Sequence, residues 1–316
     1  MPLDPQVRRF LDRLAAATPR AAAGLSVAER RTSIERLMSL AGDPEPVTQL
    51  EKRSIPGPAG RLRAWVYTPA GAHLGLLPGL VYFHGGGFVA GSLETHDGIC
   101  RSLTNASGCR LVSVDYRLGP EARFPAAVDD ACAATRWVAG QAGPLGIDVG
   151  CIGVCGDSAG ATLAAVVAQR LTAEGNSPLA LQFLLCPILD YRRDTPSRTA
   201  FGSGHLLELE TLEHDLRHYL GEQADPGDPR ISPLRARRLE GLPPACIHTA
   251  ECDPLRDEGA EYAARLEKAG VPASYRCHSG MIHLFYALGA VIPYGAEAYG
   301  LMGADIRARF ESKESP

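Results

Sequence analysis

The chain has 316 residues, of which 45% are hydrophobic and 22% are charged, and its formal net charge is −4. This composition is typical of a globular protein that can bury a large core. The slight negative charge, without long runs of like charge, argues against a nucleic-acid-binding surface. No apolar run approaches the length of a membrane span, so no stable membrane insertion is expected.

The amino-terminal residues and the cysteines indicate the compartment. Residues 1–6 lack a basic region followed by an apolar core, so no signal peptide is expected. The nine cysteines are scattered along the chain without a C-x-x-C motif. We therefore expect reduced thiols in a cytoplasmic protein, not disulfides or zinc ligands. The oligomeric state is left open, including a homodimer.

The first part of the chain predicts helices followed by a pair of strands. Apolar spacing predicts helices over residues 4–18 and 26–41, and the second opens with a capping box from Ser26 to Glu29. Strands are expected over 47–54 and 62–67. A turn rich in proline and glycine separates them, which favours an antiparallel edge pair.

From Leu80 onward, short apolar strands alternate with helical segments. This alternation predicts an α/β fold with a doubly wound, mostly parallel sheet flanked by helices. Residues 1–45 and 190–235 stand outside the alternation and are expected to form a helical cap, while 46–189 and 236–316 form the two parts of the core. The expected strands are 80–83, 110–114, 151–155, 180–185, 246–249 and 273–277, and the expected helices are 94–106, 126–139, 161–168, 257–269 and 294–310.

Residues 156–160, Gly-Asp-Ser-Ala-Gly, are a G-x-S-x-G motif between a predicted strand and a predicted helix. Strand, turn and helix are the context of a nucleophile elbow, in which a strained turn exposes the hydroxyl of Ser158. The flanking glycines would leave room for close packing at the turn. The N–H of Ala159, at the helix N-terminus, would be the first donor to an oxyanion. Alone, so short a motif also occurs by chance.

A second motif, His84-Gly85-Gly86-Gly87, directly follows the apolar strand at 80–83. Successive glycines let backbone N–H groups approach a ligand, and Gly85 and Gly86 are expected to complete an oxyanion hole with Ala159. The alternatives are a flexible turn or a phosphate-binding loop, but the chain has no G-x-x-x-x-G-K motif. His84 is expected to bond the loop backbone and not to act as a base.

A serine nucleophile needs a carboxylate and a histidine, which follow the serine in that order in this fold. His283 is favoured over His278 as the base because it lies beyond a turn glycine after the last predicted strand. Asp253 is favoured as the acid because Pro254 keeps it in a loop at the end of the preceding strand. The other acids considered are Glu251, Asp257 and Glu258, and the last two are expected to pair with a helix dipole.

Jointly, these segments resemble the hormone-sensitive-lipase-like family of bacterial esterases among the α/β-hydrolases. The resemblance implies an α/β-hydrolase fold with an eight-stranded sheet and a helical cap. It also implies a serine carboxylesterase that hydrolyses short- to medium-chain acyl esters through an acyl-enzyme, without a cofactor. The segments that carry it are 84–88, 115–121, 156–160, 228–234 and 253–258, with His283 downstream.

The chain departs from this family pattern at three places. Ala161 and Leu284 stand where members commonly have glycine, and His214-Asp215 stands where many relatives carry aromatic residues in the cap. The changed cap residues leave the pocket lining, and so the substrate preference, unpredicted.

Two other motifs in the chain and two other functions are open to interpretation. His214 and His218 have the i, i+4 spacing of a zinc helix but lack a third ligand, and a metal is not expected. Gly150, Gly153 and Gly156 only loosely match a dinucleotide motif. The same three residues acting on an arylformamide, a lactone or an acetylated small molecule stay an alternative. A non-catalytic small-molecule receptor is disfavoured, because receptors derived from this family lose the base.

Overall fold

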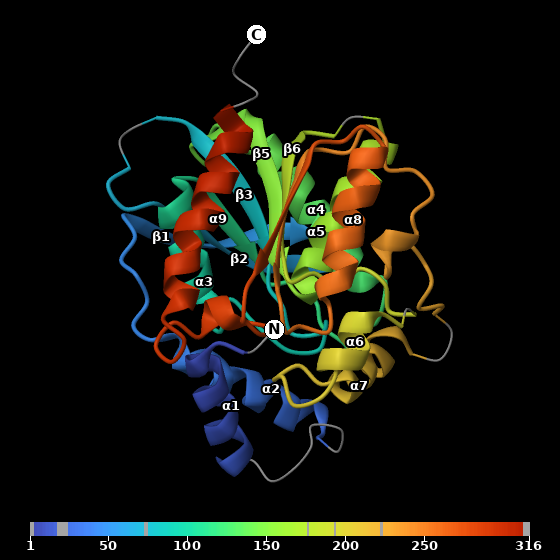
Figure 1. Cartoon of the computed structure of the whole chain (residues 1–316). Helices are drawn as coiled ribbons and strands as arrows, with labels where there is room; N and C mark the ends of the chain where they lie inside the picture. The colour runs from blue at the N-terminus through green and yellow to red at the C-terminus, as the bar shows by residue number, and fades with distance from the viewer. Residues whose placement is uncertain are drawn as a thin grey trace.

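The computed structural model describes residues 3–17, 25–72, 75–175, 177–192, 194–221 and 224–311. Its centre is an eight-stranded sheet with the order β1-β2-β4-β3-β5-β6-β7-β8 (Figure 1). β2 is antiparallel to both of its neighbours, and all other neighbouring strands are parallel. The predicted sheet and its antiparallel edge pair are confirmed. The strands are β1 (Gln49–Gly57), β2 (Gly60–Thr68), β3 (Leu77–Phe83), β4 (Arg110–Val114), β5 (Ile147–Asp157), β6 (Leu179–Leu185), β7 (Ala245–Ala250) and β8 (Ala273–His278).

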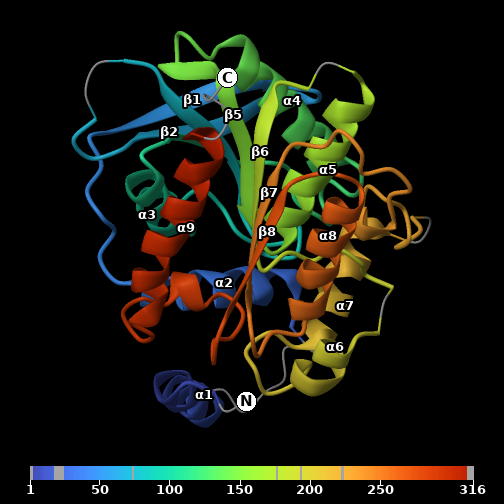
Figure 2. The ribbon, with the colours of Figure 1, turned by 45° about the horizontal axis from the view of Figure 1, so that its top comes forward.

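Helices cover both faces of the sheet. α3 and α9 pack together on one face, and α4, α5 and α8 cover the other (Figures 1 and 2). β6 and β7 are buried along their whole length, as a sheet covered on both faces requires. None of the described helices is long and apolar enough to cross a membrane. The core helices are α3 (Asp97–Ser107), α4 (Ala126–Gly140), α5 (Ala159–Ala173), α8 (Arg256–Lys268) and α9 (Tyr294–Glu311).

Four further helices lie together at the end of the molecule where the parallel strands finish (Figures 1 and 2). Two come from the amino terminus and two from the segment between β6 and β7. The capping box predicted at Ser26 is present, and its hydroxyl accepts the N–H of Glu29. Residue 18, the last of the first expected helix, lies outside the described residues. These helices are α1 (Pro5–Ala17), α2 (Val27–Met38), α6 (Pro196–Phe201) and α7 (Leu209–Leu220).

Several predicted boundaries differ from the structure by a few residues, and two of these differences have a local explanation. The helix expected from residue 94 begins at Asp97, because Ser92 and Thr95 bond each other's backbone N–H groups and hold a turn before it. The strand expected over 151–155 extends over 147–157, because β5 pairs with β3 at both of its ends. Gly150 therefore lies inside a strand, as Gly153 and Gly156 do, and none of the three opens a helix.

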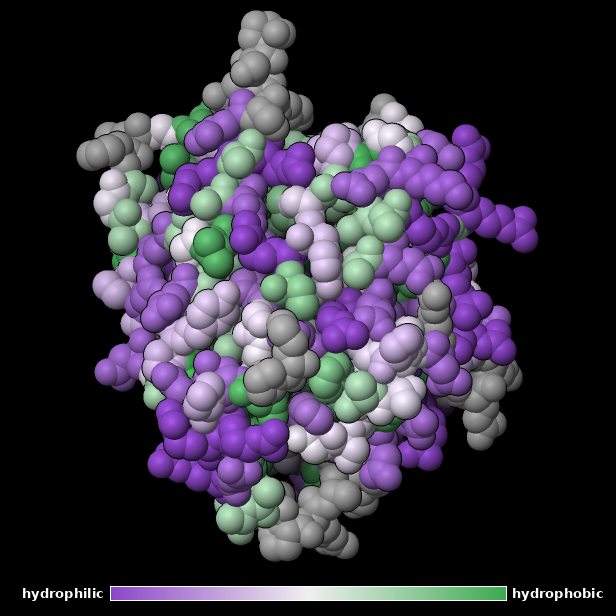
Figure 3. Space-filling view, viewed as in Figure 1, coloured by the Kyte–Doolittle hydropathy of each residue, from purple (hydrophilic) through white to green (hydrophobic). Residues whose placement is uncertain are grey.

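The face seen in Figure 3 is largely hydrophilic, with hydrophobic residues in small groups among the polar ones. The functional candidates lie elsewhere, at the carboxyl ends of the parallel strands. β3, β5, β7 and β8 all finish at this edge, immediately before the predicted site residues. The carboxyl edge of a doubly wound sheet is where such folds bind ligands.

Candidate active site

The turn at Ser158 has the strained geometry expected of a nucleophile elbow. Its backbone has φ 52° and ψ −120°, a conformation that side chains rarely adopt. The N–H of Ser158 donates to the carbonyl of Leu185 at 2.8 Å, which fixes the turn against β6. A Cβ on Gly160 would collide with the carbonyl of Phe83, and one on Gly156 would collide with Gly160. The predicted need for glycine at both positions is thus confirmed.

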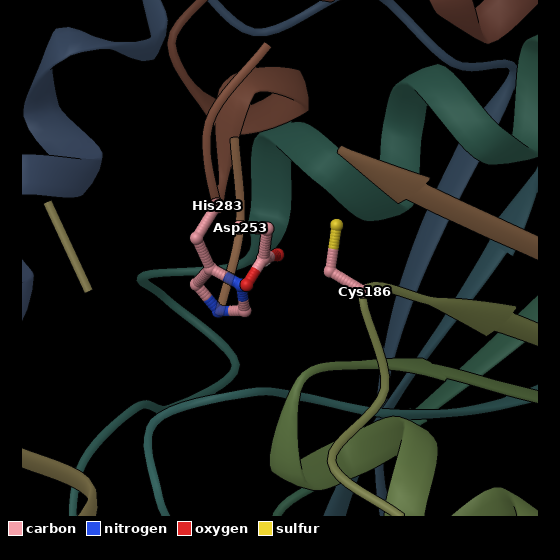
Figure 4. A group of neighbouring side chains, drawn as sticks. All are labelled: Cys186, Asp253 and His283. Carbon is pink, nitrogen blue, oxygen red and sulfur yellow. Dashed lines mark hydrogen bonds and ion pairs between the residues drawn. The ribbon is translucent and has the colours of Figure 1, made fainter. Parts of the chain in front are cut away.

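Ser158, His283 and Asp253 form one hydrogen-bonded chain. The Oγ of Ser158 lies 3.1 Å from Nε2 of His283, and Nδ1 of His283 lies 2.7 Å from Oδ2 of Asp253. Figure 4 shows the imidazole facing this carboxylate. The other oxygen of Asp253 accepts the N–H of Leu255 at 2.9 Å, which holds the carboxylate in place. All three side chains are buried, so bulk water does not compete for these bonds.

The carboxylates that were weighed against Asp253 have other partners. Glu251 accepts the Ser279 hydroxyl and the Gly280 N–H, in the loop that leads to His283. Asp257 and Glu258 do lie in the first turn of α8, but they do more than pair with its dipole. Asp257 accepts the N–H of Ser197 at 2.8 Å.

Glu258 is completely buried and joins the segment after β6 to the core. It accepts the N–H groups of Leu189 and Asp190 and forms an ion pair with Arg198 at 2.7 Å. The expectation of a simple helix-dipole role was therefore incomplete, since the contacts of Glu258 reach far beyond its own helix.

His278 is also occupied elsewhere. Its Nε2 lies 3.0 Å from Nδ1 of His248, and its Nδ1 lies 2.9 Å from the hydroxyl of Tyr294. Burial, together with the neighbouring His248, lowers the pKa of His278 to about 3, so its imidazole is neutral. Both ring nitrogens of His278 have hydrogen-bond partners at the end of β8. Of the two candidate bases, His283 is the one that lies beside Ser158.

The triple-glycine loop (residues 84–87) corrects one prediction. The N–H of Gly85 donates to Oδ1 of Asp157 at 2.9 Å, so it is not free to bind an oxyanion. The N–H groups of Gly86 and Gly87 have no acceptor among the described residues, and both glycines line the cavity at Ser158. Gly87, two residues further along the chain than Gly85, is therefore a candidate oxyanion donor beside Gly86.

Asp157, the first variable residue of the G-x-S-x-G motif, anchors the triple-glycine loop from the end of β5. Its carboxylate also accepts the hydroxyl of Tyr82 and lies 3.6 Å from Nε2 of His96. Burial opposes its ionisation, but His96 and the hydrogen bonds hold the pKa of Asp157 below its usual value.

His84 bonds the loop backbone, as predicted. Its Nδ1 lies 2.8 Å from the carbonyl of Gly85, and its ring stacks on Tyr116 with centroids 4.4 Å apart. Burial, and then the neighbouring His96, lower the pKa of His84 to about 3, so the ring is neutral.

A small cavity lies directly over Ser158 and opens beside a larger groove. The cavity has a volume of about 40 Å³, room for a few atoms beyond the reacting centre, while the groove has about 1210 Å³. Arg30, Ile34, Leu207, His283 and Leu284 line both spaces. The remaining lining of the cavity is Met38, Gly86, Gly87, His96, Ser158, Ile188, Leu212 and Asp215.

Comparisons with known proteins agree with this geometry. A family model described as the alpha/beta hydrolase fold matches residues 80–287. The chain belongs to this family. It is 40% identical over 268 residues to esterase LipI of Mycobacterium tuberculosis, covering 84% of this chain and 83% of that protein. It is 43% identical over 214 residues to an ethyl acetate hydrolase of Pseudomonas putida, covering 67% of each.

A solved α/β-hydrolase structure has the same fold as this chain. An ester hydrolase from the metagenome of Lake Arreo superposes with a TM-score of 0.94 at 40% identity, covering 98% of this chain and 99% of the other. The predicted resemblance to the hormone-sensitive-lipase-like esterases is thereby confirmed.

Leu284, one of the departures from the family pattern, has a structural explanation. It has φ 61° and ψ 14°, the left-handed conformation that favours glycine. A leucine there costs about 1 kcal/mol of strain. Its side chain lines the cavity beside His283. Leu284 therefore narrows the α/β-hydrolase pocket where a glycine would leave it open.

The described residues offer one group that could surround a metal ion, Cys186, Asp253 and His283, whose ligand atoms lie within 4.8 Å of one another (Figure 4). The 2.7 Å bond between Asp253 and His283 already uses two of these ligands. Burial raises the pKa of Cys186, which keeps it a thiol instead of the thiolate that metals prefer. The group does not fit a metal. His214 and His218 gather no third ligand within the described ranges.

Sequence reasoning did not find Gly87, Asp157, Arg30 or Asp215 as parts of the site. Gly87 had a signal, since it closes the same glycine run. Asp215 had a partial signal as a changed residue of the expected cap, but Arg30 had none. The two lie far apart in the chain and meet only when α2 and α7 pack over the cavity.

Proposed function

We propose that this protein is a serine carboxylesterase that cleaves short- to medium-chain acyl esters through an acyl-enzyme. One observation carries the proposal. The hydroxyl of Ser158, on a strained elbow, is linked through His283 to the buried carboxylate of Asp253 and faces a cavity. The ester-hydrolysing relatives support the same activity.

In the proposed reaction, Oγ of Ser158 attacks the ester carbonyl carbon while Nε2 of His283 takes the hydroxyl proton. The carbonyl π bond opens, and its electron pair moves onto the oxygen of a tetrahedral intermediate. The carboxylate of Asp253 keeps the Nδ1 proton in place and stabilises the imidazolium that forms. When the intermediate collapses, His283 gives its proton to the departing alcohol, and an acyl-Ser158 ester remains. Water then attacks this ester by the same route.

The oxyanion is assigned to the N–H groups of Gly86, Gly87 and Ala159. Gly86 and Gly87 line the cavity without another acceptor in the described structure, and Ala159 is the first residue of α5, where N–H groups have no partner within the helix. One such donor contributes about 3 kcal/mol to the transition state.

The size of the substrate follows from the two spaces at Ser158. The small apolar cavity suits a short acyl chain, and the adjoining groove between α2 and the segment before α7 can take a longer chain or the alcohol. We propose that residues 1–45 and 190–235 act as the cap that limits chain length. No cofactor or metal is needed for the proposed chemistry.

A p-nitrophenyl ester series from acetyl to palmitoyl tests the proposal, with wild type beside Ser158→Ala. The exposed Ser39 provides the matched control, Ser39→Ala, because it lies outside both spaces. We expect turnover of the shorter chains that is lost in Ser158→Ala and kept in the control. If no ester is turned over while an arylformamide or a lactone is, the alternative substrate classes replace esters.

We also propose a cytoplasmic location, supported by nine cysteines that all remain free thiols, eight of them buried. A homodimer is proposed from the sheet edge, since β8 has a neighbour on one side only and Tyr275 on it is 38% exposed. Light scattering of the purified protein measures this state directly.

A further inference from the structure

A buried cluster of charged and polar groups joins the two halves of the cap. Nε and Nη2 of Arg30 on α2 donate to the carboxylate of Asp215 on α7 at 3.0 to 3.3 Å. Nδ1 of His214 lies 3.0 Å from Oδ1 of the same carboxylate. The side chains of Arg30 and Asp215 are only 11% and 3% exposed. An ion pair this deeply buried is unusual, and removing one partner leaves an uncompensated charge.

The carboxylate of this cluster touches the triple-glycine loop. A Cβ placed on Gly87 would collide with the carboxylate and Cβ of Asp215. Arg30 and Asp215 both line the cavity over Ser158, yet neither bonds to Ser158 or His283. The cluster is thus placed to act on the loop and not on the nucleophile or its base.

The charge of Asp215 creates a difficulty for the reaction. A carboxylate in contact with Gly87 lies next to the position where the substrate oxygen gains negative charge. In an enclosed site, repulsion between two such charges would slow the reaction by more than tenfold. Arg30 cancels the charge, because two of its N–H groups point at the same carboxylate.

We propose that Arg30 is a positioning residue for ester hydrolysis: it neutralises Asp215, and the pair holds Gly87 where its N–H meets the oxyanion. This inference rests on the proposed function. It explains why a chain with Asp215 at this place in α7 also needs the long, charged side chain of Arg30 on α2. Arg31, the next residue of α2, ties the same helix to the carbonyl of Val89, just beyond the loop, and to that of Gly119.

The test compares Arg30→Met, Arg30→Lys, Asp215→Asn and the double variant Arg30→Met/Asp215→Asn by steady-state kinetics on p-nitrophenyl butyrate. Arg30→Met leaves Asp215 charged beside the oxyanion, and we expect kcat to fall about tenfold or more with little change in KM. Arg30→Lys keeps a cation and should recover most of this loss. Asp215→Asn removes the opposing charge and should lose less kcat than Arg30→Met.

The double variant decides between a charge effect and simple packing. If Arg30 acts by neutralising Asp215, the double variant has a kcat at least fivefold above that of Arg30→Met. If the pair only supports the packing of α2 against α7, Arg30→Met and Asp215→Asn lose kcat equally, and the kcat of the double variant is no higher. That result would overturn the proposal.

Arg198→Met is the matched control. Arg198 and Glu258 form another buried pair that ties the segment after β6 to the core, but neither residue lines the cavity. This variant should lose stability while kcat is kept. Hydrogen exchange of the peptide covering residues 80–92 adds a measurement that does not depend on turnover. We expect faster exchange in Arg30→Met than in wild type or Arg198→Met. Unchanged exchange would contradict the proposal that the Arg30–Asp215 pair holds Gly87 in place, even if the protein hydrolyses no ester.

Discussion

Acid should destabilise this protein through the histidine at the end of β8. His278 has a pKa of about 3 in the folded chain, because it is buried beside His248, against about 6.5 in an unfolded chain. Below pH 6.5 His278 is therefore protonated in the unfolded chain, whereas in the folded chain it stays neutral until the pH approaches 3. Stability is lost as the pH falls through this window. At pH 4.5, two units below the unfolded value, the loss from this residue alone is about 2.5 kcal/mol relative to pH 7.

Burial beside His248 opposes the protonation of His278, and the hydrogen bonds around the two rings fix which of their nitrogens carry protons. Nε2 of His248 donates to Asp305 at 3.2 Å, so Nδ1 of His248 must accept from His278. Nδ1 of His278 then accepts the hydroxyl proton of Tyr294. A further proton on Nδ1 of His248 would face the N–H donor of His278. One on Nδ1 of His278 would create a buried imidazolium beside His248, which burial opposes.

Urea denaturation of wild type and His278→Gln at pH 7 and pH 4.5 measures this contribution. A hydrogen bond lost in the variant lowers its unfolding free energy at both pH values. This loss cancels when the difference between the two pH values is compared with that of wild type. We expect the difference in unfolding free energy between the two pH values to be about 2.5 kcal/mol smaller in the variant than in wild type. An equal pH dependence in both proteins would refute the assignment of a neutral, proton-refusing His278.

Two further predictions concern the cavity. Gly85→Ala should lower kcat at least tenfold, because the added Cβ collides with the carboxylate of Asp157. Gly98→Ala on α3 is the control, because the nearest atom to the added Cβ would be 3.9 Å away. This variant should keep its kcat and gain about 0.5 kcal/mol in unfolding free energy. Equal losses of kcat in the two variants would contradict the loop geometry. Leu212→Ala removes a buried side chain from the cavity wall, so the preferred acyl chain in the ester series should lengthen while unfolding free energy drops by about 2 to 3 kcal/mol. An unchanged chain-length profile would place the acyl group outside the cavity.

The parts of this molecule that depend on neighbours in the chain could be predicted from the sequence. The elbow at Ser158 needs a strand before it, a helix after it and small residues on both sides, and all of these lie within a short segment. The order of nucleophile, acid and base is likewise a property of the chain. The choice of Asp253 over Asp257 needed only the proline that follows it.

Features that depend on distant contacts could not be predicted. The glycine run suggested that any of its N–H groups could face a ligand. Only the position of β5 beside β3 shows that Asp157 takes the N–H of Gly85. The pair of Arg30 with Asp215 joins residues 185 positions apart, and no periodicity connects an arginine in one amphipathic helix to an acid in another.

The two carboxylates beside the triple-glycine loop show how the loop is held. Asp157 takes the N–H of Gly85 from the core side, and Asp215 presses on Gly87 from the cap side. Between these anchors, the N–H of Gly86 has no partner within the described structure and lines the cavity. Carboxylates on both sides of a loop proposed to bind an oxyanion would weaken that binding unless cations or hydrogen-bond donors neutralise their charges. Asp157 is compensated by hydroxyl and imidazole groups of the core, while Asp215 depends on Arg30 from another segment. If the proposed role of Arg30 holds, the cap contributes to catalysis as well as to substrate selection.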